Sequence, residues 1–564
     1  MPLDAPVMMA LRPWRRREFS IVNEEDDGSI FQQKYPTTGP IWPTVGLMMY
    51  RPLARNLYRN DFFTGRNSLR FAKKAFFEAR AEVSLGFVPC SVVGEAQLPL
   101  KRLAKRNLNH EISANISGKR SKLLRLAAAA VVFVFGSSHH VQAEDWPTFL
   151  GPTMDLHSGE TGLNLEYGPE GPPVLWEVER GGGHAGPVVV DDHVVFIHQV
   201  DSKEEVKCVM ADTGEEVWSH SYDVEMANAA ETYGIFDAPR SSPVIDPETK
   251  LVYTLGNDGD LICFELSSGE IVWEKSLPAV FGPSPFFFGY GSCPLVFGEK
   301  LIVQVGSDSA TVAALDKKTG DTIWTTDHDW NGSYASPVVM PVNGVDCLVV
   351  FAGGKVKPTH GGVLLIDPTD GAVKDSFPWR SDNFASVNAA TPVPCGPNRV
   401  FITEDYGKGG VMLQYDSAFH ARILWTSPEF GCQFQTPIYH EGIVYGFGGN
   451  GGLMLAFDAA TGRHLWNEAF YQTTIPWNGR DIPISLGHAH LIYVDGGFLC
   501  LSENGSLIRM FLDAGGFQLG SMARLFYTPE TWAPPVVSNG RLFINKNYDG
   551  TKLICYDISG TKSE

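Results

Sequence analysis

The sequence has no pair of cysteines placed to act together. None of its nine cysteines is adjacent to another, and none forms the CxxC or CxxCH spacing of a thiol redox or haem site. Several lie inside apolar runs, where cysteine is usually a small buried hydrophobe. Export would permit disulfides, but the spacing predicts no particular pairing. Eight cysteines follow residue 143: Cys208, Cys263, Cys293, Cys347, Cys395, Cys432, Cys500 and Cys555.

The apolar run that ends at Phe135 is shorter than a membrane-spanning helix. The run Leu126–Phe135 is too short for a transmembrane helix, which needs about 20 residues. Basic residues precede it and Val141-x-Ala143 follows it, which completes the three regions of a secretory signal peptide with a small-residue cleavage site. We interpret residues 119–143 as a signal peptide and expect a periplasmic or otherwise exported protein. A membrane anchor is the alternative.

The chain before this segment has no repeat and no clear strand or helix period. Because export signals are read at the N-terminus, we interpret residues 1–118 as a start site placed too early; a disordered or genuine cytoplasmic extension is the alternative. Residues 1–130 hold 21 Lys and Arg against 11 Asp and Glu, and the remaining chain holds 24 against 53. So acidic a body repels nucleic acid and anionic membrane surfaces. We expect a monomer that neither binds nucleic acid nor inserts stably into a membrane.

One turn sequence recurs along the acidic part of the chain. The pattern A-x-D-x-x-T-G-x-x-x-W is complete at Ala314–Trp324 and Ala456–Trp466, and partial copies occur elsewhere. In one copy Ala421 replaces the glycine, and two copies have Asp375 and Arg509 in place of the tryptophan. The turn glycines are Gly214, Gly269, Gly320, Gly371, Gly462 and Gly505.

Each copy belongs to a unit of four short runs rich in β-branched and aromatic residues, a pattern typical of an all-β repeat. In the turn, the aspartate accepts backbone N–H groups and the glycine supplies a positive φ. A four-stranded sheet cannot bury both faces alone, and a tryptophan on its outer strand can cover the next sheet. We therefore predict inter-blade packing, with a platform for aromatic ligands as the alternative, for Trp176, Trp218, Trp273, Trp324, Trp425 and Trp466.

Counting these units gives eight blades. The eighth lacks a fourth strand, and the run Pro172–Arg180 near the start lacks partners, so one N-terminal strand can complete the ring. We predict that residues 144–564 form an all-β, eight-bladed β-propeller of four-stranded antiparallel blades, closed by that strand. The predicted blades span 186–222, 241–277, 291–329, 335–379, 390–430, 436–470, 484–515 and 533–560.

On these residues the chain resembles the pyrroloquinoline-quinone-like (PQQ-like) repeat family of eight-bladed propellers. That family includes quinoprotein alcohol dehydrogenases, the B-type lipoprotein of the outer-membrane assembly machine and many exported bacterial proteins. The resemblance covers about residues 144–559 and includes "DWPTFLGP" and "GDLICFELSSGEIVW". The motif is specific for the fold and says little about activity.

For a quinone dehydrogenase, the resemblance would imply a ring of two adjacent cysteines, a calcium held by Glu, Asn and Asp, a catalytic Asp and a Trp beneath the cofactor. The sequence has no adjacent cysteines. We therefore assign no catalytic residue, no metal site and no cofactor. We favour a non-catalytic propeller that binds a protein or polymer partner. The alternative is a PQQ- and calcium-dependent alcohol dehydrogenase, a polymer-alcohol oxidase included.

The longer connections between blades, at 223–240, 278–290, 471–483 and 516–532, are expected on one face of the ring, around the mouth of the central channel. An aromatic connection, Phe281–Gly291, serves either as core packing or as an exposed contact surface. Residues that enter the inner strands should line the mouth and hold a ligand, or else plug the channel. These candidates are Arg240, Tyr290, Tyr334, Asn388, Gln435 and Trp532, with Arg240 as an inward-pointing clamp for an anionic or carbonyl group.

Overall fold

The structure is a computed structural model in which the chain divides into two compact units at Ala128 and Ala129. In the first unit, strands β1 (Phe19–Glu24) and β2 (Ile30–Tyr35) form an antiparallel hairpin where no element was expected. Both strands are rich in β-branched or aromatic residues. The signal-peptide prediction for 119–143 lies outside the described residues. The described ranges are 19–24, 30–35, 144–225, 239–354, 359–448 and 451–560.

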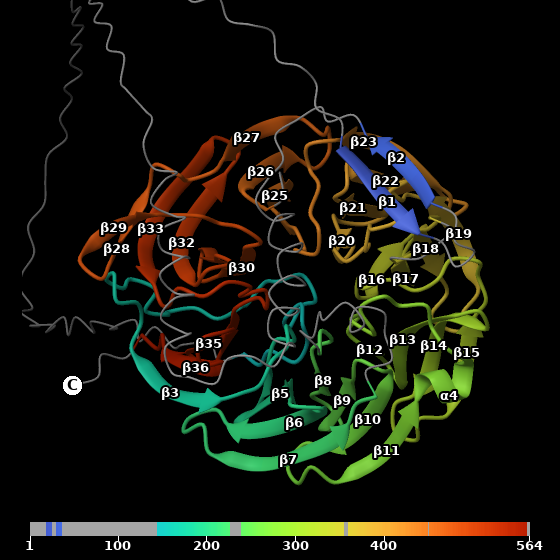
Figure 1. Ribbon diagram of the computed structural model, residues 1–564, viewed down its shortest axis with the longest axis horizontal. Helices are drawn as coiled ribbons and strands as arrows, with labels where there is room; N and C mark the ends of the chain where they lie inside the picture. The colour runs from blue at the N-terminus through green and yellow to red at the C-terminus, as the bar shows by residue number, and fades with distance from the viewer. Residues whose placement is uncertain are drawn as a thin grey trace, which may run out of the picture. The chain divides into compact units, whose positions relative to one another are not determined.

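The second unit is a ring of blades around a central axis (Figure 1). Within the described ranges, its strands form eight four-stranded antiparallel sheets, which confirms the predicted fold class. The first four blades run from the inner to the outer strand as follows: β4 (Val188–Val190), β5 (His193–Val200), β6 (Lys203–Met210) and β7 (Glu216–Asp223); β8 (Val244–Asp246), β9 (Leu251–Leu255), β10 (Asp260–Glu265) and β11 (Ile271–Ser276); β12 (Leu295–Phe297), β13 (Lys300–Ser307), β14 (Ala310–Asp316) and β15 (Thr322–Thr326); β16 (Val338–Val342), β17 (Val345–Ala352), β18 (Gly362–Ile366) and β19 (Val373–Pro378).

The remaining blades follow the same order, and the last one takes its outer strand from the front of the chain. Strand β3 (Val174–Glu179) pairs with β36 (Lys552–Asp557), which confirms the predicted closure of the ring by an N-terminal strand. These blades are: β20 (Val393–Pro394), β21 (Arg399–Glu404), β22 (Gly409–Tyr415) and β23 (Ala421–Ser427); β24 (Ile438–His440), β25 (Ile443–Gly448), β26 (Leu453–Asp458) and β27 (His464–Glu468); β30 (His490–Val494), β31 (Gly497–Leu501), β32 (Ser506–Asp513) and β33 (Gly516–Arg524); β34 (Val536–Ser538), β35 (Arg541–Lys546), β36 (Lys552–Asp557) and β3 (Val174–Glu179).

Blade seven corrects the sequence prediction. Gly505 lies in the turn between its second and third strands, so it does not mark the turn before the outer strand, and Arg509 does not stand in the tryptophan position. The outer strand is β33, within the stretch 516–532 that was expected to be a mouth connection. The sequence "SENGS" around Gly505 imitates the repeated turn because both reversals need a residue with positive φ.

Other segments lie outside the eight sheets. The stretch 471–483, also expected at the mouth, forms a hairpin of β28 (Thr474–Trp477) and β29 (Arg480–Pro483) that packs beside β33 (Figure 1). A short helix, α4 (Leu277–Phe281), follows β11 with Ser276 as its N-cap. In the part of the chain that is described, no helix has the length and apolarity to cross a membrane.

Every outer strand of the described ring carries a β-bulge, and the residue that follows it faces the next blade. At the bulge of β15, for example, Trp324 pairs with Ala314 after one unpaired residue. Equivalent bulges place Asp375 in blade four and Met522 in blade seven. The same position is occupied in the other six blades by Trp176, Trp218, Trp273, Trp324, Trp425 and Trp466.

Each of these six indoles donates its Nε1–H to a backbone carbonyl of the next blade, at 2.7–3.2 Å. In all but Trp466, the ring lies against the turn glycine of the next blade. A Cβ on Gly320, whose φ is 75°, would come within 2.8 Å of the Trp273 ring. Four of the indoles are buried, whereas Trp273 and Trp466 are only half-buried, contrary to the prediction. Trp466 meets the short turn between β32 and β33, which covers less of the ring.

Among the described interfaces, two use other groups. Between blades four and five, the carboxylate of Asp375 accepts the backbone N–H of Ala421 at 2.8 Å. Between blades seven and eight, the N-terminal arm (residues 159–167) takes the place of the indole. The backbone N–H of Asn164 donates to the carbonyl of Ile558, which directly follows β36, at 2.8 Å. The arm is held further by Glu160, which accepts the backbone N–H groups of residues 539 and 540.

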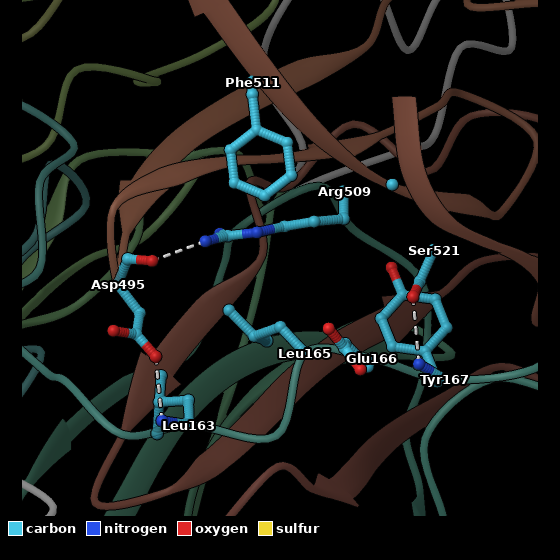
Figure 2. Close-up of a pocket in the computed structure, with 9 residues that line it drawn as sticks. Leu163, Leu165, Glu166, Tyr167, Asp495, Arg509, Phe511 and Ser521 are labelled. Atoms are coloured by element: carbon cyan, nitrogen blue, oxygen red, sulfur yellow. Dashed lines mark hydrogen bonds between the residues drawn. The ribbon is translucent and has the colours of Figure 1, made fainter. Parts of the chain in front are cut away.

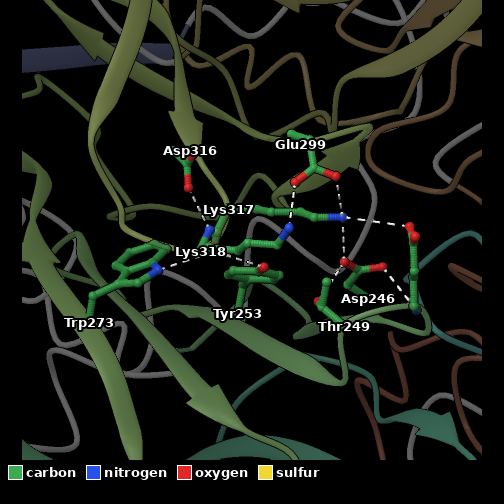
Figure 3. Close-up of polar contacts among 9 residues, drawn as sticks. Asp246, Thr249, Tyr253, Trp273, Glu299, Asp316, Lys317 and Lys318 are labelled. Atoms are coloured by element: carbon green, nitrogen blue, oxygen red, sulfur yellow. Dashed lines mark hydrogen bonds and ion pairs between the residues drawn. The ribbon is translucent and has the colours of Figure 1, made fainter.

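A buried ion pair strengthens the interface between blades two and three (Figure 3). Lys317, 1% exposed, follows β14 and reaches Asp246 at the end of β8, with 2.7 Å between Nζ and Oδ2. Its backbone carbonyl accepts hydrogen bonds from both Tyr253 and Trp273. One residue of the repeated turn therefore contributes its main chain to the indole and its side chain to the preceding blade.

Candidate binding site at the channel mouth

The residues that enter the inner strands follow a common pattern. In seven blades the inner strand begins directly after a proline, which has no N–H to donate and suits the first position of an edge strand. In five of these seven, a large, half-buried side chain stands three residues before that proline. These five residues are His184, Arg240, Tyr334, Phe434 and Trp532.

Four rings from consecutive blades meet at this mouth and form what we call the aromatic–histidine cluster: His184, Phe434, His488 and Trp532. The Trp532 ring centroid lies 4.5 Å from that of His184 and 5.0 Å from that of Phe434. Phe434 stacks on His488 at 4.9 Å. Because these residues come from blades one, six, seven and eight, their contacts show that the side chains converge toward the channel axis.

A hydrogen-bond network fixes the rings of this cluster. Glu503, in the turn after β31, accepts the Trp532 indole N–H at 2.9 Å and pairs with His488 Nδ1 at 3.2 Å. His488 Nε2 lies 3.1 Å from Oε1 of Gln433, whose amide in turn donates to Tyr406. Burial acts to raise the pKa of Glu503, but its bonds with His488 and Trp532 outweigh burial and lower it.

Arg240 lies beside a second group of rings. Its Nη1 donates to the carbonyl of Phe288 at 2.9 Å, and its guanidinium carbon lies 5.3 Å from the centre of the Phe288 ring. The hydroxyl of Tyr334 accepts the backbone N–H of Phe288 at 3.0 Å. Burial and then the nearby charge of Arg240 lower the pKa of His184 far below its usual range. Arg240 is thus half-buried and near the aromatic–histidine cluster.

The connection Phe281–Gly291 combines both roles that the sequence left open. Phe281 and Phe286 are buried in the core, and the ring of Tyr290 packs against Phe286 at 5.0 Å. Phe288, in contrast, is half-buried beside Arg240. Phe281, Phe286 and Tyr290 are therefore core, whereas Phe288 contributes to the mouth.

Three of the expected mouth residues lie in the channel wall. Tyr290 is 4% exposed, and Asn388 and Gln435 are 1% exposed. The Asn388 amide donates to the carbonyl of Ala352 at 2.9 Å. Gln435 Oε1 accepts backbone N–H groups of the two residues before it. The count from the sequence is one residue off at each of these places, because Gln435 follows the inward-facing position and Tyr290 and Asn388 precede it.

Two buried glutamates on this face, and the half-buried Glu503, were not identified from the sequence. Glu204 accepts the Asn257 N–H and the Tyr222 hydroxyl, and Glu404 accepts the Ser381 N–H and the Ser386 hydroxyl. Burial raises the pKa of Glu204 to about 7 and also raises that of Glu404. Like Glu503, both have their two oxygens bonded to donors of the chain. Over the ranges that are described, no three His, Cys, Asp or Glu side chains group as metal ligands would.

His184, Phe434 and His488 were also missed. A signal for the first two was present, since both stand three residues before a proline that precedes an inner strand. His488 has no such mark, because blade seven has Leu491 where the proline would be expected. Its position follows only from the packing of three neighbouring blades.

Comparison with known proteins agrees with this architecture. The model of the family described as "Outer membrane protein assembly factor BamB" matches residues 202–468. No curated protein matches the chain in sequence. A europium-containing methanol dehydrogenase is 12% identical, with a TM-score of 0.51 over 72% of this chain and 90% of that chain. At such low identity the likeness shows the fold alone.

Two further solved structures are similar over much of their length. BamB from Moraxella catarrhalis is 17% identical, with a TM-score of 0.46 over 68% of this chain and 99% of that chain. The quinohemoprotein alcohol dehydrogenase from Comamonas testosteroni is 14% identical, with a TM-score of 0.49 over 74% of this chain and 81% of that chain.

Proposed function

Since this chain belongs to the eight-bladed β-propellers with PQQ-like repeats, we propose that it is an exported, non-catalytic protein that binds a protein or polymer partner at the channel mouth. The observation that carries this proposal is the aromatic–histidine cluster. Half-buried aromatic rings held in fixed positions lose little entropy when they bind, and they dominate the energy of many interfaces. Arg240 adds a planar donor group close to these rings.

The chemistry of the mouth favours an extended segment with an apolar or aromatic group and a nearby acceptor. Trp532 and Phe434 offer ring faces, and the positive charge of the Arg240 guanidinium lies close by for a carbonyl or carboxylate. Export is supported by the signal-like sequence of residues 119–143 and by the acidity of the propeller. Both features suit a protein that works outside the cytoplasm without binding nucleic acid.

A PQQ-dependent alcohol dehydrogenase is the second candidate, because the same fold occurs in a methanol dehydrogenase. The residues of the mouth do not fit a quinone held by calcium. The carboxylates of Glu204, Glu404 and Glu503 are bonded to the chain's own donors, and they belong to three blades that are not adjacent. The eight cysteines of the propeller are buried, single and unlinked. We therefore derive no redox step.

The proposal can be tested by selecting a displayed peptide library on the purified full chain. We expect enriched peptides with an aromatic residue, whose affinity falls about tenfold in Trp532→Ala, since truncating a central aromatic anchor costs more than about 1 kcal/mol. Tyr527→Ala is the matched control, because Tyr527 is an exposed aromatic that contacts Arg524 instead of the cluster. Equal binding by wild type and Trp532→Ala would contradict the proposal. Dye reduction with alcohols after addition of PQQ and calcium would favour the dehydrogenase.

A further inference from the structure

The bulge of blade seven, where the outer strand carries no tryptophan, borders a pocket of about 630 Å³ (Figure 2). Its walls are the N-terminal arm on one side and strands β32 and β33 on the other. In the register of this sheet, Arg509 stands opposite the two bulged residues Gly520 and Ser521. The volume is within the range of about 300–1,000 Å³ that is usual for small-ligand sites.

Arg509 is the centre of the pocket. It is 5% exposed, and its Nη1 and Nη2 donate to the backbone carbonyls of Val494 and Asp495 at 2.8 and 2.6 Å. These two bonds hold the guanidinium plane in one orientation. The ring of Phe511, 43% exposed, lies over that plane with 5.2 Å between the guanidinium carbon and the ring centre. The pocket thus combines a fixed planar cation with an accessible aromatic face.

Blade seven and the arm together supply the complementary polar groups. The carboxylate of Asp495 holds the arm by accepting the Leu163 N–H at 2.8 Å, and Ser521 holds it by accepting the Tyr167 N–H at 3.0 Å. The Tyr167 hydroxyl is buried at the wall of the pocket and has no hydrogen-bond partner. Glu166 lies beside it and is exposed.

This combination of charges narrows the class of ligand. An anion would be attracted by Arg509 but repelled by the carboxylates of Asp495 and Glu166. A cation would be attracted by the carboxylates but repelled by Arg509. A neutral polyol can accept hydrogen bonds from the guanidinium and donate to the carboxylates at the same time. The apolar face of a sugar ring can also pack on Phe511. We propose that this pocket binds one sugar unit of a neutral oligosaccharide, at a site separate from the channel mouth.

Saturation-transfer NMR on the full chain tests this proposal with two neutral probes, cellotriose and triacetylchitotriose, and an acidic one, trigalacturonate. We expect saturation transfer to at least one neutral probe and a dissociation constant about tenfold higher in Phe511→Ala. Phe517→Ala is the matched control, because Phe517 is 40% exposed on the same hairpin but contacts Trp466 and Phe470 instead of the pocket. It should bind as wild type does.

A second variant, Arg509→Lys, keeps the charge and removes the planar fork, and it should weaken binding while near-ultraviolet circular dichroism reports on its fold. Trp532→Ala should leave sugar binding unchanged, which separates this site from the mouth. Three results would overturn the proposal: no transfer to either neutral probe, tighter binding of trigalacturonate, or neutral-sugar binding that survives Phe511→Ala.

Discussion

At each blade interface, one blade must cover a turn of the next blade and bond to its backbone. Six interfaces do this with an indole, and two use other groups. Where a tryptophan follows the bulge, one side chain covers the neighbouring turn and satisfies one of its carbonyls. At Asp375 a carboxylate satisfies an N–H but covers little apolar surface. Between blades seven and eight a whole segment of the arm is needed. The comparison shows that the repeat preserves a contact position more strictly than a residue type.

The two interfaces without an indole also differ in whether a pocket lies beside them. Asp375 is 18% exposed and lies in a compact interface, next to Lys374, which packs over Phe419. At the arm, in contrast, the pocket around Arg509 lies beside the interface. The position without an indole in blade seven thus borders a pocket, whereas in blade four the carboxylate contacts the next blade directly.

The largest expected effect is at a fully docked interface. Trp324→Ala should lower the free energy of unfolding by about 3–5 kcal/mol, since it removes a large buried ring and its hydrogen bond to Pro368. Urea unfolding followed by circular dichroism measures this. The half-buried Trp466 provides the comparison: Trp466→Ala should cost clearly less, and equal losses would show that ring burial does not set the strength of these interfaces.

Next comes the ion pair behind Trp273. Asp246→Ala should cost about 3 kcal/mol, because Lys317 would keep a buried charge with only Glu248 and Glu299 near it, at 4.0 and 3.8 Å. The exposed neighbour Lys318 gives the control, and Lys318→Ala should change thermal stability little. A melting temperature unchanged in Asp246→Ala would mean that water reaches Lys317.

The arm interface should depend on pH. Burial raises the pKa of Glu160 to about 7, from 4.5 in the unfolded chain. Its stabilising contribution is therefore complete below pH 4.5 and is lost as the pH rises through about 7, on the order of 3 kcal/mol. Hydrogen exchange of residues 159–167 should become faster over that range, and Glu160→Gln should remove the change. Glu204 also has a pKa raised to about 7. The pH dependence of hydrogen exchange in blades one and two should therefore be the same in the wild type and in Glu160→Gln.

The smallest effect is expected at the interface between blades four and five. Asp375→Asn keeps an acceptor for the Ala421 N–H and removes the charge, so it should cost about 1 kcal/mol, as the change from a charged to a neutral hydrogen bond usually does. Urea midpoints of the two proteins measure it. A cost as large as that of Trp324→Ala would show that the carboxylate is as important as an indole.

The repeat made the fold predictable, because Asp, Gly and Trp at fixed spacing encode a turn, a positive φ and a packing surface. It failed in blade seven, where the turn at Gly505 has the same local chemistry as the docking turn but a different place in the sheet. The mouth was predictable only in part. The positions of Arg240 and Trp532 follow from their spacing before the inner strands. His488 comes close to Trp532 only because neighbouring blades pack together, and no local sequence pattern indicates that contact.

The pairing of β3 with β36 also sets the order of events during synthesis. Val174 and Tyr556 are partners in one sheet although roughly 380 residues separate them, so the outer strand of the last blade is made first and its partners come last. Until then β3 presents an unpaired edge, with Val174 and Leu175 exposed even in the finished ring. Closing so long a loop is slow compared with forming local hairpins. The blades can therefore assemble one after another as they emerge, but the ring becomes a single cooperative body only when its final strands arrive.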